Sequence, residues 1–485
     1  MTLKIYNQII SATKWSSMAE LASKLIMPIS TIILARLLTP EDFGILVTAT
    51  MVISFAELFT DAGFHKYLIQ HHFLSDDEKY KSTTVAFWTN LSISVLAWIL
   101  IIFFSKEIAF LVGCPGKEFI IIISCVCIPI VSFSSIYSAL LKKELNFKTL
   151  FFVRIISTLV PLFITVPLAF ITRSYWALII GMIALNLATA IILALKSSWK
   201  PYLFFDIIYL KQMLSFSIWS MFESVSIWLT GYIDIFIVGS VLNQHYLGIY
   251  RTSMTTVSQI TALIISATTP VLYSSLSQLQ NNRDEFKKLF FRFQKMVGML
   301  VIPLGFGIYI FRSLIVELLL GKQWHEAVHF VGLWGLTSSI TIVLAHYSSE
   351  VYRSMGKPKI SVIVQFLHIA ALLPVVLYFV NEKFETLCLA RSLVRLQLVL
   401  INLFFMHFLV KISPYMMLKN ILPAFFCSVL MFFSVFILPE TTEMIKSFLY
   451  VAWAIAVYFV AISCFPTERY MMKKIIELCF HKRRL

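Results

Sequence analysis

Long runs of apolar residues, separated by short polar stretches, recur along the whole chain. Each of fourteen runs is long enough to cross a hydrocarbon core of about 30 Å as an α-helix. The runs cover residues 15–37, 43–68, 83–104, 118–141, 150–171, 175–196, 214–240, 252–272, 293–311, 327–350, 360–380, 386–410, 420–438 and 447–465. The pattern predicts an all-α integral membrane protein with about 14 transmembrane helices.

Charged residues interrupt four of these predicted spans, and they follow helical spacing. They are Glu20 and Lys24 in the first span, Glu57 and Asp61 in the second, Glu223 and Asp234 in the seventh, and Arg391 and Arg395 in the twelfth. An ionised side chain at bilayer depth costs several kcal/mol unless it faces the interior of a helix bundle or a wet cavity. Repetition of this feature in four helices predicts a polar path through the membrane, which is typical of a transporter.

The spacing of two of these pairs predicts how their charges are compensated. Glu20 and Lys24 are four residues apart, so they can form an ion pair along one helix face. Glu57 and Asp61 have the same spacing but like charges, which favours a shared proton or a nearby cation.

The basic residues in or next to these spans are candidates for binding an anionic substrate. They are Lys24, Arg251, Arg391 and Arg395. The acidic candidates, which either take up a coupling ion or balance these cations, are Glu20, Glu57, Asp61, Glu223 and Asp234. Eleven helical residues return to within about 20° of the same face, so Glu223 and Asp234 are expected to face one cavity. The alternative is a set of interhelical ion pairs that only hold the bundle together.

Composition excludes a soluble protein and explains the basic net charge. Of the 485 residues, 59% are hydrophobic and 13% are charged, whereas soluble proteins have about 25% charged residues. The net charge of +15 suggests a nucleic-acid partner. However, if the N-terminus is cytoplasmic, Lys and Arg on the cytoplasmic side outnumber those on the opposite side by roughly three to one. We therefore expect cytoplasmic N- and C-termini and no nucleic-acid partner.

An internal repeat predicts how the chain is divided. Residues 33–45 align without gaps on residues 237–249, with identities at Ile33, Leu38, Gly44 and Ile45. Because six spans separate the two copies, both halves share one orientation, as in parallel repeats. The expected parts are an N-terminal six-helix bundle (1–196), a cytoplasmic interfacial connector (197–213), a C-terminal six-helix bundle (214–410), two additional transmembrane helices (411–465) and a basic cytoplasmic tail (466–485).

The sequence gives little support for an enzyme or a metal site. His325, Glu326 and His329 match the H-E-x-x-H pattern of zinc proteases, but they lie at the outer mouth of the tenth predicted span. No third ligand follows at a familiar distance, and there is no P-loop pattern. We therefore expect no catalytic residue, no metal and no cofactor.

Several blocks, taken together in order and spacing, resemble a known family. They are Ala35-Arg-Leu-Leu-Thr-Pro-Glu-Asp-Phe-Gly44, Leu140-Leu-Lys-Lys-Glu-Leu-Asn-Phe147, Asp234-Ile-Phe-Ile-Val-Gly239, Leu247-Gly-Ile-Tyr250 and Gly321-Lys-Gln-Trp324. Over about residues 10–360 the chain resembles the polysaccharide transporter family, the Wzx-type O-antigen or lipid-linked oligosaccharide flippases of the MATE-like superfamily. The resemblance implies two six-helix bundles around a central cationic cavity, two additional C-terminal helices, and alternating access.

The same resemblance implies a substrate and a location. The substrate would be an undecaprenyl-pyrophosphate-linked oligosaccharide, moved from the cytoplasmic to the periplasmic leaflet of a bacterial inner membrane. Other expected partners are the lipid bilayer and membrane proteins of glycan assembly. Trp15, Trp219 and Trp228 can either stack on sugars or anchor their helices at the membrane interface.

Two other functions stay open. One is a cation-coupled multidrug exporter of the same superfamily, and the acidic candidates leave room for its ion coupling. The other is a membrane O-antigen polymerase or ligase, which is disfavoured because the chain has no large external loop for catalytic arginines.

Overall fold

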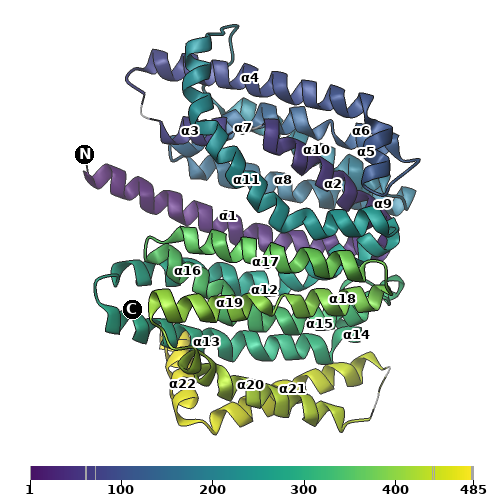
Figure 1. Cartoon of the computed structure of the whole chain (residues 1–485), viewed down its shortest axis with the longest axis vertical. Helices are drawn as coiled ribbons and strands as arrows, with labels where there is room; N and C mark the ends of the chain where they lie inside the picture. The colour runs from purple at the N-terminus through teal and green to yellow at the C-terminus, as the bar shows by residue number, and fades with distance from the viewer. Residues whose placement is uncertain (1, 61–62, 72, 440, 442, 482–485) are drawn as a thin grey trace. The chain divides into compact units, whose positions relative to one another are not determined.

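The computed structural model describes residues 2–60, 63–71, 73–439, 441 and 443–481, apart from the side chains of 2–10, 13, 215–223, 358, 474–476 and 478–481. Within this part of the chain every regular element is a helix (Figure 1). The described residues contain 14 helical stretches that are long and apolar enough to cross a membrane. The predicted all-α membrane protein with about 14 spans is confirmed.

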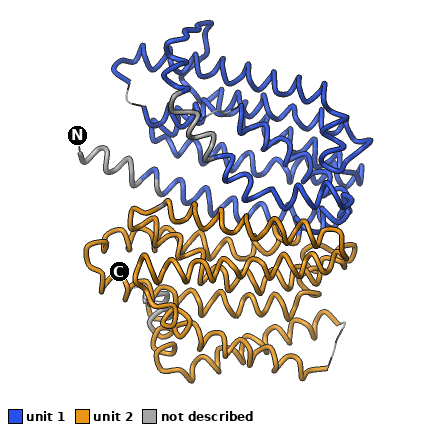
Figure 2. Tube along the Cα trace, in the orientation of Figure 1, with its two compact units in different colours: residues 1–252 blue, residues 253–485 orange. Residues whose placement is uncertain are grey.

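The helices form two compact units, residues 1–252 and residues 253–485 (Figure 2). The first unit contains α1 (Thr2–Leu37), α2 (Pro40–Thr60), α3 (Phe64–Gln70), α4 (Asp76–Phe103), α5 (Ser105–Leu111), α6 (Glu118–Ser124), α7 (Cys127–Lys143), α8 (Phe147–Val160), η1 (Pro161–Thr165), α9 (Val166–Thr172), α10 (Trp176–Lys196), α11 (Ile207–Val241) and the start of α12 (Gln244–Gln278). The second unit contains the rest of α12 and α13 (Arg283–Ile310), α14 (Arg312–Leu319), η2 (Lys322–Trp324), α15 (Ala327–Thr341), η3 (Ile342–His346), α16 (Tyr347–Ser354), α17 (Pro358–Phe379), α18 (Phe384–Val394), α19 (Gln397–Phe405), η4 (Met406–Val410), α20 (Pro414–Phe436), α21 (Met444–Ser463) and α22 (Pro466–His481). The domain limits expected from the sequence remain predictions.

Two predicted spans contain breaks that individual residues explain. α2 ends at Thr60, and α3 begins after Gly63, whose φ of 78° lies in the left-handed region that favours glycine. The single helix predicted over residues 43–68 is therefore wrong. In the fifth predicted span Pro161 lacks an amide hydrogen, and the α-helix gives way there to the π-turn η1 before α9 continues.

The expected connector is part of the packed first unit. Trp199 is buried, and its ring lies 5.5 Å from the ring centres of both Phe87 on α4 and Tyr137 on α7. α11 already begins at Ile207, within the expected connector, and continues without interruption to Val241. The segment between α10 and α11 is thus anchored by an aromatic cluster to the helices that surround the candidate site.

The two copies of the internal repeat have equivalent helix boundaries. α1 ends at Leu37 and α2 begins at Pro40, while α11 ends at Val241 and α12 begins at Gln244. These boundaries coincide when the sequence is shifted by the offset that aligns the repeat.

Equivalent residues also cap the two helices that follow. The Thr39 amide donates to the Asp42 carboxylate at 2.8 Å, and the Asp42 amide donates to the Thr39 hydroxyl at 3.3 Å. At the matching place the Tyr246 amide donates to the Asn243 side-chain oxygen at 3.1 Å. Side chains of this kind satisfy the unpaired amides of a helix start, so the repeat extends to local hydrogen bonding.

The two repeat copies contact each other within the first unit. A Cβ added at Gly44 would overlap the backbone oxygen of Gln244, and one added at Gly248 would overlap the backbone oxygen of Pro40. Gly248 is the repeat equivalent of Gly44, and Gln244 is the repeat equivalent of Pro40. The two contacts are therefore equivalent. This reciprocity is the property of a contact across a pseudo-two-fold axis. We refer to these four residues as the repeat contact.

In the second unit, α13 is the central helix and packs against α15 and α20. The C-terminal helices are fastened to it by polar contacts. Tyr458 on α21 donates to the backbone oxygen of Met299 at 2.8 Å, and Lys295 pairs with the buried Glu468 on α22 at 2.9 Å. A buried ion pair of this kind is costly to break because one partner would remain charged and unpaired.

Candidate functional site

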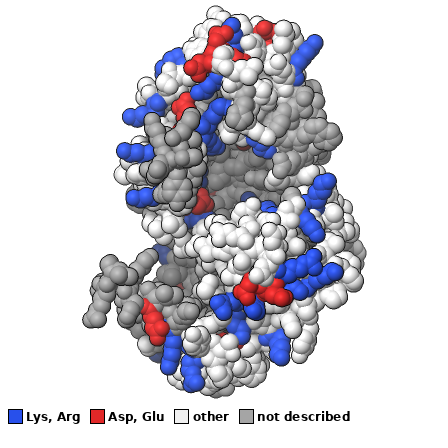
Figure 3. Space-filling model, turned by 90° about the vertical axis from the view of Figure 1, so that its left-hand side faces the viewer, with Lys and Arg blue, Asp and Glu red and all other residues white. Residues whose placement is uncertain are grey.

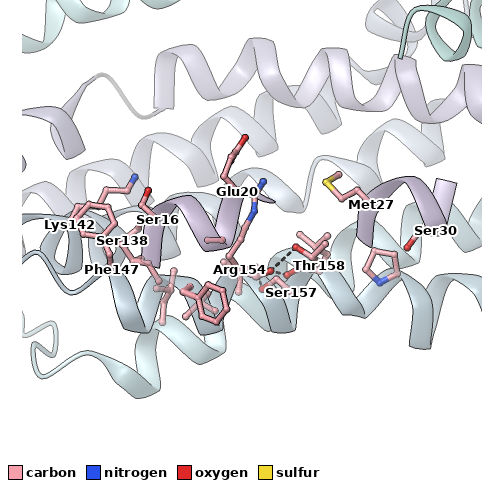
Figure 4. Close-up of a pocket in the computed structure, with 18 of the residues that line it drawn as sticks. Ser16, Glu20, Met27, Ser30, Ser138, Lys142, Phe147, Arg154, Ser157 and Thr158 are labelled. Atoms are coloured by element: carbon pink, nitrogen blue, oxygen red, sulfur yellow. Dashed lines mark hydrogen bonds between the residues drawn. The ribbon is translucent and has the colours of Figure 1, made fainter. Parts of the chain in front are cut away.

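The first unit contains a cavity of about 660 Å³ between α1, α7, α8 and α10 (Figure 4). We call it the Arg154 chamber. Its polar lining consists of Ser16, Glu20, Ser30, Thr31, Ser138, Lys142, Arg154, Ser157, Thr158 and Thr189. The rest of the lining is apolar and includes Phe151 and, near Lys142, Phe147. All four helices belong to membrane-length stretches, so this polar volume lies inside the membrane-spanning part of the unit.

Arg154 is the central cation of this chamber. Its side chain rises from α8 toward α1 (Figure 4), where its Nε donates to the Oγ of the buried Ser23 at 3.1 Å. The neighbouring Thr158 hydroxyl donates to the Arg154 backbone oxygen at 2.6 Å. A guanidinium has about five N–H donors in a planar fork. The bond to Ser23 therefore fixes the fork while leaving donors that suit a phosphate or carboxylate.

A second cavity of about 660 Å³ lies between α2, α3, α4, α7, α10 and α11. We call it the Trp228 chamber. Its polar lining consists of Ser54, Glu57, Thr60, His65, Asn90, Ser132, Ser134, Ser135, Ser138, Lys142, Thr189, Ser224, Trp228 and Tyr232. Most of these groups are uncharged hydroxyls and amides.

The two chambers share part of their walls. Ser138, Lys142, Thr189 and Leu193 line both cavities. Lys142 lies at the last turn of α7, whose small serine side chains face this region. The cation of Lys142 is therefore placed where the Arg154 chamber and the Trp228 chamber meet.

The charged pair on α1 forms as its spacing predicts. Lys24 Nζ lies 3.0 Å from the Glu20 carboxylate. Glu20 also lines the Arg154 chamber, so its charge compensates Lys24 at the edge of that cavity. Whether Lys24 contacts a substrate stays a prediction.

The acidic candidates of the second and seventh spans are described only in part. Glu57 is half-buried and lines the Trp228 chamber. Asp61 and the side chain of Glu223 lie outside the described residues. The proposed sharing of a proton between Glu57 and Asp61, and the shared cavity of Glu223 and Asp234, therefore stay predictions.

Asp234 is buried and accepts hydrogen bonds from both helices of the repeat. The Tyr250 hydroxyl donates to its Oδ2 at 3.0 Å, and the Ile235 amide donates to its Oδ1 at 2.9 Å. The guanidinium of Arg251, next to Tyr250, lies 5.5 Å from the centre of the Tyr232 ring. This is a cation–π distance, and it places Arg251 against a side chain of the Trp228 chamber.

Arg391 and Arg395 lie together in the second unit. Their guanidinium carbons are 4.9 Å and 4.4 Å from the centre of the Trp334 ring on α15, and Arg395 donates to the Ser338 hydroxyl. Two like charges on one ring are stabilised by its electron-rich faces. Their proposed position on the substrate path stays a prediction.

Several chamber residues were not among the sequence candidates. Arg154 lies four residues inside its predicted span, a position from which a long cation can reach the membrane surface, so sequence alone did not single it out. Arg154 is exposed, and its i+3 and i+4 neighbours Ser157 and Thr158, which are buried, continue its polar stripe along α8. Asn90 and the α7 serines carried no distinctive motif.

The tryptophans of the predicted spans have separate surroundings. Trp15 packs against Phe151 and Phe152, with ring centres 5.1 Å and 5.9 Å away. The side chain of Trp219 lies outside the described residues, whereas Trp228 lines a chamber.

Basic side chains are prominent on the face that Figure 3 shows. Blue Lys and Arg side chains predominate over red Asp and Glu among the residues that are drawn in colour. The charge asymmetry of the sequence assigns the more basic loops to the cytoplasm. The orientation itself stays a prediction.

Comparison with known proteins supports a role in glycan biosynthesis. A family model described as "Polysaccharide biosynthesis protein" matches residues 33–329. An uncharacterized membrane protein in the cps region of Klebsiella pneumoniae is 26% identical over 385 residues, which cover 78% of this chain and 77% of that protein. The succinoglycan biosynthesis transport protein ExoT of Rhizobium meliloti (strain 1021) is 24% identical over 327 residues, which cover 67% and 65%.

A solved structure has the same fold. The lipid II flippase MurJ in an inward closed conformation superposes with a TM-score of 0.75, covering 94% of this chain and 99% of that one at 16% sequence identity. At this identity the likeness shows the fold alone. It confirms the flippase-type architecture that the sequence resemblance implied, and the relatives with named roles are transport proteins rather than enzymes.

Proposed function

Because the chain belongs to the polysaccharide biosynthesis protein family, we propose that it is a flippase for undecaprenyl-pyrophosphate-linked glycan repeat units. It moves them from the cytoplasmic to the periplasmic leaflet of the bacterial inner membrane. The transport role in the name of the succinoglycan relative supports this proposal. So does the helical fold, whose described residues include 14 stretches that are long and apolar enough to cross a membrane.

The observation that carries the proposal is the Arg154 chamber. A pyrophosphate that leaves water needs compensating cations and hydrogen-bond donors, since an uncompensated charge in a low-dielectric site is costly. The chamber offers the Arg154 fork, Lys142 and several hydroxyls in a cavity bounded by membrane-length helices. Translocation makes and breaks no covalent bond, so no catalytic residue is required.

The repeat contact supplies a way to alternate access. It joins the helix starts that follow Leu37 and Val241, at the end opposite to the predicted cytoplasmic face. We infer that the path is closed there when the chambers load from the cytoplasm. For release, the two repeat copies separate while the bundles keep their internal packing.

A reconstituted flipping assay tests the function. Proteoliposomes would contain an undecaprenyl-pyrophosphate disaccharide that carries a nitrobenzoxadiazole label, and dithionite would bleach the label in the outer leaflet. With the wild-type protein we expect nearly all label to become accessible. Empty liposomes and Arg154→Gln should keep the inner-leaflet fraction protected. A labelled phosphatidylethanolamine should stay protected throughout, and bleaching identical to that of empty liposomes in the wild-type sample would contradict the proposal.

One observation favours a second function, a cation-coupled drug exporter. Glu57 lies in the Trp228 chamber beside aromatic side chains, a combination that also suits an organic cation. If the protein is such an exporter, proteoliposomes with an imposed proton gradient should accumulate tetraphenylphosphonium, and the labelled glycolipid should remain protected.

A further inference from the structure

The Trp228 chamber is lined mainly by groups that pair with hydroxyls. Beside Glu57, His65 and Lys142, its polar side chains are uncharged hydroxyls, one carboxamide and two aromatic polar groups on five helices. Its volume of about 660 Å³ lies in the range of about 300–1,000 Å³ that is typical of small-molecule sites. A neutral ligand with many hydroxyls matches this lining better than an anion does.

Two polar atoms in the wall of this chamber are covered by the surrounding protein and have unused hydrogen-bonding capacity. Asn90 is fully buried, and its amide nitrogen donates to the Ser135 hydroxyl at 3.0 Å, which fixes the amide. Among the described residues, neither Asn90 Oδ1 nor the Oγ of the buried Ser132 has a hydrogen-bond partner. Ser132 lies one helical turn before Ser135 on α7, so the two atoms belong to one face of the chamber. Unpaired polar atoms in a buried site are unfavourable unless a ligand pairs with them.

An aromatic wall stands on α11 in the same chamber. The Trp228 indole donates to the Ser54 hydroxyl at 3.0 Å, which fixes the ring orientation. Its ring centre lies 5.4 Å from that of Tyr232 at an interplanar angle of 17°, and 4.9 Å from that of Phe55. The negative face of an aromatic ring attracts the partly positive C–H bonds on the apolar face of a pyranose.

The chamber adjoins the cationic site. Lys142 and Ser138 line both chambers, and Arg154 lies on the far side of that shared wall. In a lipid-linked glycan the first sugar is bonded directly to the pyrophosphate. A site for sugars would therefore lie next to a site for phosphate, as these two chambers do.

We propose that the Trp228 chamber is a sugar-binding subsite for the glycan part of the substrate. Trp228 stacks on a pyranose ring. A side-chain adjustment in the chamber wall brings Asn90 Oδ1 and Ser132 Oγ, which the wall covers in this structure, to the sugar hydroxyls. Glu57 accepts from a further pair of hydroxyls. This inference rests on the proposed flippase function and names the part of the molecule that selects among glycans.

Binding of simple probes to the purified protein in lipid nanodiscs tests the subsite. Saturation-transfer NMR would measure the methyl glycosides of glucose, galactose, N-acetylglucosamine and N-acetylgalactosamine, and inorganic pyrophosphate binding would be measured separately by calorimetry. We expect at least one glycoside to bind the wild type. Trp228→Ala should weaken that binding about tenfold, by analogy with bases stacked on aromatic side chains, and Trp228→Phe should restore much of it.

Matched variants separate the two chambers and control for folding. Trp98 is also half-buried on a membrane-length helix and donates its indole N–H, to the backbone oxygen of Ile122 at 3.0 Å. It lines neither chamber. Trp98→Ala should leave glycoside binding unchanged. Asn90→Leu should weaken glycoside binding but not pyrophosphate binding, and Arg154→Gln should do the reverse.

The remaining outcomes contradict the inference in distinguishable ways. If no glycoside binds, or if binding is equal in wild type and Trp228→Ala, the subsite is wrong even where the labelled glycolipid is still flipped. If tetraphenylphosphonium binds instead and Glu57→Gln abolishes its binding, the chamber is a cation site and the flippase proposal fails as well.

Discussion

At the scale of single residues, polar groups line cavities where a charged or hydroxylated ligand can use them. Arg154 is exposed, lines a cavity within the membrane-length stretches, and has its guanidinium held by the bond to Ser23, a combination that favours a functional role. Glu20 and Lys24 compensate each other on the same helix face. The chemistry of this site therefore depends on a few groups with unused bonding capacity rather than on net charge.

Arg154 should be essential for phosphate recognition. Arg154→Gln removes the cation, and Arg154→Lys keeps the charge but loses the fork and the bond to Ser23. We expect pyrophosphate binding to fall at least about tenfold in Arg154→Gln and less in Arg154→Lys, which corresponds to about 1.4 kcal/mol or more for the former. Calorimetry measures both. Arg173→Gln, at an exposed arginine beyond α9, should behave as wild type, and a normal affinity in Arg154→Gln would rule out this role.

Asp234 should balance charge rather than couple transport to protons. Its carboxylate accepts from Tyr250 and from a backbone amide, and an asparagine oxygen can accept at least one of these bonds. Asp234→Asn should lower flipping modestly and by the same factor with and without an imposed proton gradient. Tyr250→Phe serves as the control that removes the donor. Loss of only the gradient-dependent part of flipping in Asp234→Asn would identify Asp234 as the coupling site.

At the scale of helices, the sequence predicted the spans well and their interruptions poorly. Hydropathy over about 20 residues is a cumulative signal, so every predicted run corresponds to a described membrane-length stretch. The end of α2 before Gly63 and the π-turn η3 (Ile342–His346) depend on single backbone conformations, which apolar periodicity does not record. Only the turn at Pro161 had a clear local cause in the sequence.

The sequence predicted that a polar site lies within the membrane spans, but it did not identify most of the residues that line the two chambers. Charges inside spans indicated a polar path, and Glu20 and Glu57 do line chambers. Asn90 and Ser132 were missed because a functional role for a buried amide or serine can be inferred only when its neighbours in space are known. Arg154 was missed because its place near a span end also suits a surface-seeking side chain.

The repeat contact should depend on glycine at positions 44 and 248. Gly44→Val would force its side chain against the backbone oxygen of Gln244, so the two repeat copies should move apart. Thr48 and Gln244 are joined by a hydrogen bond of 2.9 Å. The double variant Thr48→Cys/Gln244→Cys should therefore be joined by a short bifunctional thiol cross-linker that spans the length of the lost glutamine side chain. The yield of this cross-link should be much lower when Gly44→Val is added.

A matched glycine controls for general destabilisation. Gly307 lies within α13, and a Cβ added there meets no atom within 4 Å. Gly307→Ala should leave the cross-linking yield unchanged, because alanine also favours the helix by about 1 kcal/mol. Equal yields with Gly44→Val and Gly307→Ala would show that the repeat contact does not hold the two copies together.

At the scale of the whole molecule, charge asymmetry predicts the orientation in the membrane. Cysteine labelling with an impermeant maleimide can test it, provided that the residues replaced by cysteine do not stabilise the fold through hydrogen bonds. Thr39 and Lys143 are unsuitable because Thr39 caps α2 and Lys143 donates to the backbone oxygens of Leu68 and His71. Arg173 and Lys148 are exposed alternatives on opposite predicted sides.

From outside intact cells, Arg173→Cys should be labelled and Lys148→Cys should be labelled only after permeabilisation. The native outer-loop Cys114 adds little background, because burial raises the pKa of its thiol and the thiolate is the reactive form. The exposed Cys464 should be replaced by serine in both variants. This pattern would place the segment between α7 and α8 in the cytoplasm and the segment after α9 on the opposite side, as the proposed direction of transport requires. Labelling of Lys148→Cys in intact cells, with protection of Arg173→Cys, would place both termini outside and reverse the direction of the proposed transport.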